Sequence, residues 1–282
     1  MRILICNDDG IDAEGLKLLA KSAKRLADEV YVAAPSENYS GASRKVTFFE
    51  PLKISEPKID WADGAVIAEG TPIDALCVAL MTIHKDLKFD LVLSGINHGA
   101  NLGHDVFYSG TVNLILEAYS MGIPSIAFSQ IGYQLRMPDY LEDWIVNFVQ
   151  TVLKSDVGRF CLNVNFPSLK NFNSADAQNP EEIFNGTKYT LLSGYHHSDT
   201  FRENTVDGNE GVRQFNFERK SYIADQPDDK RLPELPELLF DQEAVNQGFV
   251  SVTPLTDALL NRETLKELIK YQRNNQHDIE KD

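Results

Sequence analysis

Two adjacent carboxylates near the start of the chain are the residues best suited to chemistry. Asp8 and Asp9 follow a short apolar run, 2–6, and precede Gly10. Neighbouring carboxylates repel each other and gain from a bound divalent cation, and ligands that are all oxygen favour Mg²⁺ or Mn²⁺ over zinc. Asp-Asp-Gly is also common as a plain turn, with Asp12 as a helix cap, so the pair alone leaves both interpretations open.

A second candidate is the glycine-rich segment 94–111. It follows a buried apolar run and ends in Ser-Gly-Thr at 109–111, where a helix is predicted to begin. Backbone amides at a helix start bind anions, and hydroxyls there add donors. A loop of this length after a buried strand is more often functional than decorative. His98 and His104 are candidate metal ligands or general acids, or ordinary loop histidines bonded to backbone.

A third loop, 35–43, offers hydroxyls and amides that could complete a metal shell, although its composition also suits an ordinary surface loop. Other enzyme classes lack their patterns here. The sequence has no G-x-x-x-x-G-K-[ST], no G-x-G-x-x-G after the first strand, no G-x-S-x-G and no H-E-x-x-H. Asp8 is followed two residues on by Gly10, so the Asp-x-Asp of aspartyl-phosphate phosphatases is missing.

Short apolar runs alternate with helical patterns and must position these three loops. Strands are predicted at 2–6, 30–34, 66–68, 89–93, 123–128 and 160–164, and helices at 14–27, 72–83, 112–119 and 140–153. This alternation favours a Rossmann-like, doubly wound α/β fold, with a mostly parallel sheet between two helix layers. Ligands of such folds bind at the carboxyl ends of the strands, where all three loops lie.

The pattern changes after residue 170. An antiparallel extension is expected there, with strands at 188–192 and 214–218, a loop at 201–211, a core strand at 249–252 and a helix at 262–273. The expected organisation is a Rossmann-like catalytic core over 1–170 plus 249–260, a β-rich extension or oligomerisation insert over 171–248, and a C-terminal helix and tail over 261–282.

The chain is acidic. Its 282 residues carry 27 lysines and arginines against 42 aspartates and glutamates, a formal charge of −15 that is spread over both halves. This balance argues against a nucleic-acid polymer or an anionic membrane as partner. A substrate that bears a phosphate would therefore need local help from a cation or from aimed backbone amides.

Cysteine usage and hydropathy favour a cytoplasmic enzyme. Cys6, Cys77 and Cys161 lie in apolar runs without paired spacing and are expected to be reduced core thiols. The apolar segment 3–6 is too short for a signal-peptide core, and no stretch of ~18 apolar residues predicts a membrane span.

Several segments, spread over most of the chain, match the motifs of a known family in the same order. They are 3–10, 33–41, 70–74, 94–112, 122–129, 162–167 and 244–255. Together they resemble the SurE (survival protein E) family of metal-dependent 5′-nucleotidases. The resemblance implies one divalent cation per subunit, Mg²⁺ or Mn²⁺, with the ligands Asp8, Asp9, Ser40 and Asn97. It also implies a phosphate site formed by Ser109, Gly110 and Thr111, with Asn101 nearby.

The expected reaction is hydrolysis of nucleoside 5′-monophosphates to nucleoside and phosphate. A metal-activated water would attack phosphorus, with Asp8 or Asp9 as proton acceptor and Asn97 in the catalytic set. Some family members also cleave 3′-nucleotides or polyphosphate. The alternatives are a phosphomonoesterase or polyphosphatase that does not act on nucleotides, and a non-catalytic nucleotide-binding protein on the same fold.

The resemblance further implies a homodimer or homotetramer in which part of the C-terminal half, here 224–260, is exchanged between subunits. The chain departs from the family pattern after Val112, where Asn113, Leu114 and Ile115 replace small residues, and at Ala118, where a glycine is expected. These changes concern helix packing and oligomer contacts more than the metal ligands.

Overall fold

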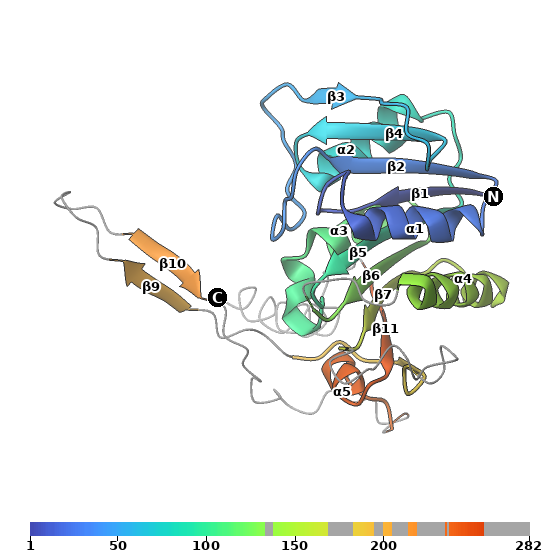
Figure 1. Cartoon of the computed structure of the whole chain (residues 1–282), viewed down its shortest axis with the longest axis vertical. Coiled ribbons are helices and arrows are strands. Elements are labelled where there is room, and N and C mark those ends of the chain that lie inside the picture. Colours follow the sequence, from blue (N-terminus) through green and yellow to red (C-terminus); the bar gives the residue numbers. More distant parts are fainter. Residues whose placement is uncertain are drawn as a thin grey trace, which may run out of the picture.

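A nine-stranded sheet runs through the computed structural model, which describes residues 1–132, 138–168, 183–194, 200–204, 214–218, 235 and 237–256 (Figure 1). The strand order is β3-β4-β2-β1-β5-β6-β7-β11-β8, and most neighbours are parallel. Only β3 against β4 and β11 against β7 are antiparallel within this sheet. Its strands are β1 (Arg2–Cys6), β2 (Glu29–Pro35), β3 (Lys53–Ser55), β4 (Gly64–Glu69), β5 (Leu91–His98), β6 (Ser125–Gln130), β7 (Cys161–Phe166), β8 (Thr187–Tyr189) and β11 (Val250–Pro254).

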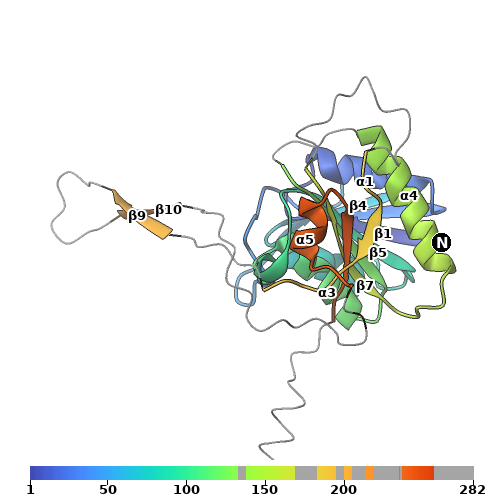
Figure 2. The same cartoon turned by 90° about the horizontal axis from the view of Figure 1, so that it is seen from below.

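Helices cover both faces of the sheet (Figure 2), which confirms the predicted doubly wound α/β architecture. On one face α1 contacts α4, and on the other α2 contacts α3. The helical elements are α1 (Glu14–Lys24), α2 (Pro72–Val78) with its π-helical continuation η1 (Ala79–Ile83), the 3-10 turn η2 (Gly103–Phe107), α3 (Gly110–Ser120), α4 (Pro138–Lys154) and α5 (Asp241–Asn246).

The first strand shows how sequence produces the layers. Successive side chains of a strand point to opposite faces. Ile3 and Ile5 accordingly pack in the cluster that contains α1 and α4, whereas Leu4 and Cys6 pack in the cluster that contains α2 and α3. All four are fully buried, as expected for a central parallel strand covered on both sides.

The structure differs from the sequence prediction at three short elements. The predicted loop 201–211 is wrong at its start, because β9 (Thr200–Asn204) forms an antiparallel ladder with β10 (Gln214–Glu218), and a polar strand of this kind carries little hydrophobic signal. The short elements β3 and α5 were not predicted. The predicted helix 262–273 lies outside the described residues.

The ladder of β9 and β10 lies apart from the main sheet in both views (Figures 1 and 2). By contrast β8 joins the main sheet through β11, although it belongs to the segment 171–248 that was expected to form the extension. The division at residues 171, 249 and 261 stays a prediction.

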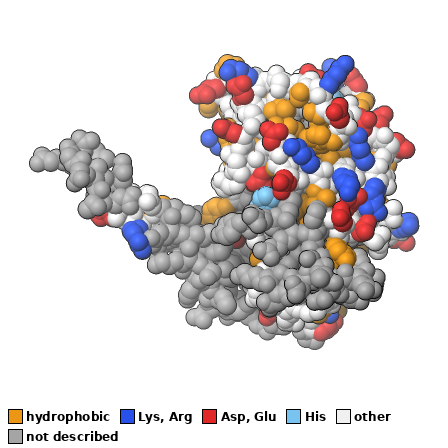
Figure 3. Space-filling model, viewed as in Figure 1, with side chains coloured by type: hydrophobic (Ala, Val, Ile, Leu, Met, Phe, Trp, Pro, Cys, Tyr) orange, Lys and Arg blue, Asp and Glu red, His pale blue; other side chains and the backbone are white. Residues whose placement is uncertain are grey.

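The surface and the thiols agree with the composition. Cys6, Cys77 and Cys161 form no disulfide, and the first and third are buried. Figure 3 shows acidic and basic side chains interleaved on the face drawn, without a continuous basic patch. Among the helices of the described ranges, none has the length and apolar character needed to cross a bilayer.

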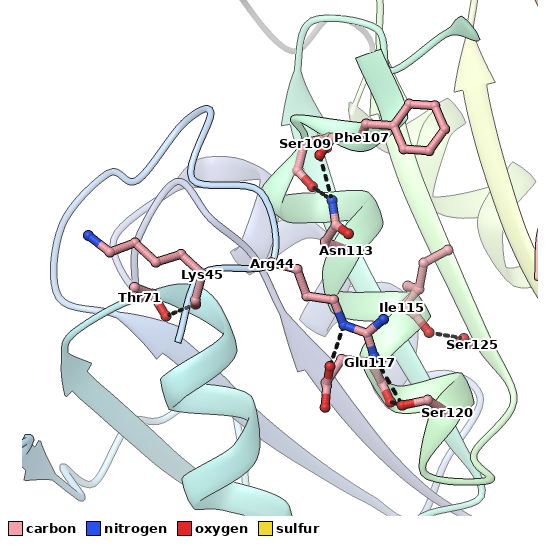
Figure 4. Close-up of polar contacts among 10 residues, drawn as sticks. All are labelled: Arg44, Lys45, Thr71, Phe107, Ser109, Asn113, Ile115, Glu117, Ser120 and Ser125. Atoms are coloured by element: carbon pink, nitrogen blue, oxygen red, sulfur yellow. Dashed lines mark hydrogen bonds and ion pairs between the residues drawn. The ribbon is translucent and has the colours of Figure 1, made fainter. Parts of the chain in front are cut away.

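A capping box connects the start of α2 to the loop that follows β2. The Thr71 hydroxyl accepts the Asp74 N–H at 3.2 Å, and the Asp74 carboxylate accepts the Thr71 N–H at 2.8 Å. The same hydroxyl donates to the Lys45 carbonyl at 2.6 Å (Figure 4). The Asp74 carboxylate also accepts hydrogen bonds from the N–H and the hydroxyl of Thr47. The box therefore secures both the helix and the far end of this loop.

Replacing Thr71→Ala removes the helix cap and the bond to Lys45. We expect the free energy of unfolding in urea to fall by about 1–2 kcal/mol. Thr151→Ala is the matched control, because its exposed hydroxyl donates only to the Asn147 carbonyl one turn earlier in α4, and it should stay within roughly 0.5 kcal/mol of wild type. Equal losses in the two variants would contradict this role for the box.

Candidate active site

The three loops predicted to form the site meet at one edge of the sheet. Strand β1 lies between β2 and β5 and is parallel to both, so the residues after these strands emerge side by side. The Tyr39 N–H donates to the Asp8 carbonyl at 2.8 Å, and the Ser43 N–H donates to the Tyr108 carbonyl at 3.0 Å. The loop after β2 thus bridges the loop after β1 and the loop after β5.

Asp8 is almost fully buried, with 3% of its surface exposed. Its Oδ1 accepts a hydrogen bond from the Thr111 hydroxyl in the first turn of α3. A Cβ on Gly110 would lie 2.6 Å from both the Cβ and the Oδ2 of Asp8, so the close approach of strand end and helix requires glycine. Burial raises the pKa of Asp8 to about 6; the Asp9 charge adds to this rise, and the Thr111 hydrogen bonds oppose it.

Asp9 and Ser40 are connected through a residue to which the sequence assigned no role. The Asn38 amide nitrogen donates to Asp9 Oδ1 at 3.0 Å, and its Oδ1 accepts the Ser40 N–H at 2.9 Å. Burial raises the pKa of Asp9, while His98 and the Asn38 hydrogen bond oppose the rise. His98 therefore lies within electrostatic reach of Asp9, and its own side chain is exposed. The alternative that Asp12 caps α1 is wrong, because the N-cap position is Ala13 and no side chain caps it.

Asn97 reaches this edge because β5 continues past its predicted end at residue 93. The register with β6 shifts between Ser94 and Asn97, and Gly95 adopts a φ of 122° there. A Cβ at Gly95 would lie 2.3 Å from the Phe128 carbonyl oxygen, so only glycine allows this irregularity. The Asn97 amide nitrogen donates to the Gly99 carbonyl at 2.9 Å, which leaves its oxygen as the atom able to bind a cation.

The donors present suit a hard divalent cation. No group of three or more His, Cys, Asp or Glu side chains placed to hold a metal occurs in the part of the chain described. The predicted ligand set has only two carboxylates, completed by a hydroxyl and an amide oxygen, and such oxygen donors match Mg²⁺ or Mn²⁺. The raised pKa of the buried Asp8 indicates that its charged form is only partly compensated by hydrogen bonds, and a cation would supply the rest.

The predicted phosphate site lies beside these donors at the start of α3. The Ser109 hydroxyl caps the helix by accepting the Val112 N–H at 3.1 Å. Thr111 is buried and its hydroxyl is turned to Asp8. The first backbone amides of a helix have no partner within it and carry the positive end of its dipole. A phosphoryl group bound there by Ser109, Gly110 and Thr111 stays a prediction.

Asn101 is buried and held by partners that sequence reasoning missed. Its N–H donates to Asn165 Oδ1 and its side chain to Ser129 Oγ, both at 2.8 Å. Its carbonyl accepts the amides of Asn163 and Asn165 at 2.8 and 3.1 Å. Two asparagines spaced by two at the end of a buried strand share one face, and this signal could have identified them.

Asp241 is a second buried carboxylate that the sequence did not single out. It accepts N–H groups from Gly103 at 2.9 Å, Ser193 at 3.0 Å and Gln242 at 2.8 Å. Burial raises its pKa, against the effect of these hydrogen bonds. Asp241 thus ties the loop after β5 to α5, through a contact between residues far apart in the chain. His104, in the same loop, is exposed, and its ring centroid lies 5.9 Å from that of Phe107.

Fold and site together define a doubly wound α/β protein with an oxygen-rich site at the carboxyl edge of its sheet. The family model described as Survival protein SurE matches residues 3–198. The chain therefore belongs to the SurE family, as its sequence motifs predicted.

Named relatives and a solved structure agree with this assignment over nearly the whole chain. The 5′-nucleotidase SurE of Erythrobacter litoralis is 34% identical over 261 residues, which cover 90% of this chain and 93% of that protein. The 5′-nucleotidase SurE of Vibrio cholerae serotype O1 is 33% identical over 270 residues, covering 95% and 96%. The crystal structure of the Sure protein from Aquifex aeolicus superposes with a TM-score of 0.73 at 34% identity, covering 97% of this chain and 100% of that one.

The burial of Asp8 predicts an unusual pH dependence of stability. In the presence of chelator, the pKa of about 6 in the folded chain lies above the ordinary value of 3.8. The stabilising contribution of the neutral form is therefore present below pH ~4 and is lost as pH rises through about 6. Asp8→Asn has no charge to bury, so near pH 7.5 its free energy of unfolding should exceed that of wild type by up to roughly 3 kcal/mol.

Urea unfolding of both proteins at several pH values between about 4 and 7.5 measures this difference. The advantage of Asp8→Asn should shrink steadily toward the acidic end. A difference that is constant over the whole range would mean that Asp8 does not bury an uncompensated charge.

Proposed function

We propose that the chain is a metal-dependent phosphomonoesterase that hydrolyses nucleoside 5′-monophosphates to nucleoside and phosphate. The observation that carries the proposal is the buried Asp8 carboxylate, which lies against Gly110 and is bonded by Thr111 at the start of α3. This contact supports the proposal, because it joins a carboxylate suited to a cation to a helix start suited to an anion. The names of the relatives, 5′-nucleotidase SurE, support the choice of substrate.

In this proposal Asp8, Asp9, Ser40 and Asn97 hold one Mg²⁺ or Mn²⁺. The bound ion would supply Lewis-acid stabilisation of the charge that develops on the phosphoryl group. The carboxylate of Asp8 or Asp9 would accept the proton of the attacking water, and the raised pKa of both groups makes them better acceptors near neutral pH than ordinary aspartates.

The remaining site residues would orient the phosphoryl group. The Ser109 hydroxyl and the Gly110 amide can donate to its oxygens, and donors fixed in place before the reaction stabilise developing charge without reorganising. The Thr111 hydroxyl donates to Asp8 and would hold that carboxylate beside the phosphoryl group. Asn101 would contribute its second amide hydrogen, because the first is engaged by Ser129. Its four hydrogen bonds to β6 and β7 hold it in position for this purpose.

The range of substrates and the assembly are further parts of the proposal. A panel of 5′- and 3′-nucleotides, polyphosphate and simple phosphomonoesters separates a nucleotidase from a phosphatase that does not act on nucleotides. We propose a cytoplasmic homodimer or homotetramer with an exchanged C-terminal segment. Exposed aromatic side chains on the separate ladder, Phe201 and Phe215, favour association through that half of the chain. Within 224–260, however, β11 pairs with β7 of its own chain.

Asp8→Asn tests the site assignment directly. We expect at least a 100-fold loss of kcat with nucleoside monophosphates and with p-nitrophenyl phosphate, in line with the typical contribution of general acid–base catalysis, about 10²–10⁴-fold. Asp12→Asn, a fully exposed aspartate a few residues on, should keep wild-type turnover. Chelator should abolish wild-type activity, and added Mn²⁺ or Mg²⁺ should restore it. Near wild-type turnover by Asp8→Asn with metal would refute the assignment, and absence of turnover by wild type with any metal would favour a binding protein.

A further inference from the structure

We propose that Ser43 and Asn113 are positioning residues that hold two segments together through one shared acceptor, the carbonyl of Phe107. The metal-side loop is the segment 36–45 after β2, and the phosphate-side turn is the segment 103–109 before α3. The Ser43 hydroxyl donates to this carbonyl at 2.6 Å, and the Asn113 amide nitrogen approaches it at 3.4 Å (Figure 4 shows the Asn113 side). The inference rests on the proposed function, because it assigns what holds the two halves of that site in register.

Ser43 adopts a backbone conformation that serine normally avoids. Its φ is 56°, and in the described ranges it is the one residue other than glycine with a positive φ. Such a conformation is unfavourable for a residue with a side chain and persists where the surroundings hold it. Here both donors of the residue are engaged, with the hydroxyl on Phe107 and the N–H on Tyr108 at 3.0 Å.

Asn113 holds the same turn from the helix side. The residue is buried, with 7% of its surface exposed, and its amide nitrogen lies near three backbone carbonyls. The distances are 2.8 Å to Ser109, 3.1 Å to Val106 and 3.4 Å to Phe107.

Contacts beyond Ser43 keep the loop on the helix. Arg44 forms an ion pair with Glu117 and donates to the Ser120 hydroxyl at 3.1 Å, so the loop follows α3 toward its last turn (Figure 4). Ser40 lies three residues before Ser43, and Ser109 lies two residues after Phe107. A hydrogen bond at Phe107 therefore fixes a proposed metal ligand relative to the proposed phosphate donors.

The consequence is that each positioning residue affects the ligand on the opposite side. Removing the Ser43 hydroxyl should weaken phosphate binding as well as Mn²⁺ binding, and removing the Asn113 amide should weaken Mn²⁺ binding as well as phosphate binding. Neither side chain belongs to the proposed ligand set. Both act on the Phe107 carbonyl, so their effects should not multiply in a double variant.

The experiment measures binding directly with Ser43→Ala, Asn113→Ala and the double variant of the full chain. Mn²⁺ affinity is read by electron paramagnetic resonance, and affinity for inorganic phosphate in the presence of Mn²⁺ by calorimetry. Each single variant should lose about fivefold in both affinities, the loss expected for one net hydrogen bond. The double variant should lose clearly less than the product of the two.

Three controls decide the interpretation. Ser36→Ala in the same loop and Asn147→Ala on the exposed side of α4 should bind like wild type. Ser43→Gly accepts the positive φ without strain but lacks the hydroxyl, so it should be impaired like Ser43→Ala. Wild-type binding by Ser43→Gly would mean that backbone strain, not the hydrogen bond, matters, and would overturn the proposal. Where Asn113→Ala fails to fold, Asn113→Ser replaces it.

The outcomes separate this inference from the proposed function. If wild type binds Mn²⁺ and hydrolyses nucleotides while the single variants match it in both affinities, only the positioning role is refuted. Exactly multiplicative losses in the double variant would also refute the shared acceptor. If wild type binds neither Mn²⁺ nor phosphate, the proposed function fails and the inference fails with it.

Discussion

A carboxylate buried at the start of a helix is the constraint to which the rest of the site conforms. Taking an ionised group out of water costs several kcal/mol unless hydrogen bonds or an opposite charge compensate it. For Asp8 the compensation within the chain is partial, because the Thr111 hydrogen bonds and the dipole of α3 favour the anion but its pKa still rises to about 6. The absence of a side chain at Gly110 is what permits so close an approach.

Neutral amide side chains hold the frame around this charged centre. Asn38 connects Asp9 to Ser40 through two hydrogen bonds. Asn113 donates to backbone carbonyls of the phosphate-side turn. Asparagines of β7 donate to the carbonyl of Asn101. An amide both donates and accepts, so it can connect two backbone segments without adding charge. A lysine or arginine in these places would compete with a divalent cation for the carboxylates. Amides therefore let the site be rigid while leaving its charge to the two aspartates.

The part of this arrangement that could be predicted from sequence is the part set by local pattern. Asp8 and the segment 109–111 directly follow or begin recognisable elements, and the rule that ligands bind at the carboxyl ends of parallel strands brings them together. The support given to Gly103 by Asp241 could not be predicted in this way, because it joins residues 138 positions apart and its donors are backbone amides that any sequence supplies. The strand β9 was not predicted for a different reason, because it is stabilised by pairing with β10 and not by a hydrophobic face.

The overall charge of −15 and the recognition of a phosphate can be reconciled only at short range. At long range the protein repels an anion, and salt screens this repulsion over roughly 10 Å. Within the site, the two aspartates are the groups that make the potential most negative, and they are also the groups that the proposed divalent cation would neutralise. With that charge removed, the N-terminal amides of α3 would lie beside the ion, and their dipole would no longer be opposed by the two aspartates. The buried Asp8 carboxylate thus destabilises the metal-free fold. By binding a cation, the same carboxylate would allow this edge of the sheet to bind an anion.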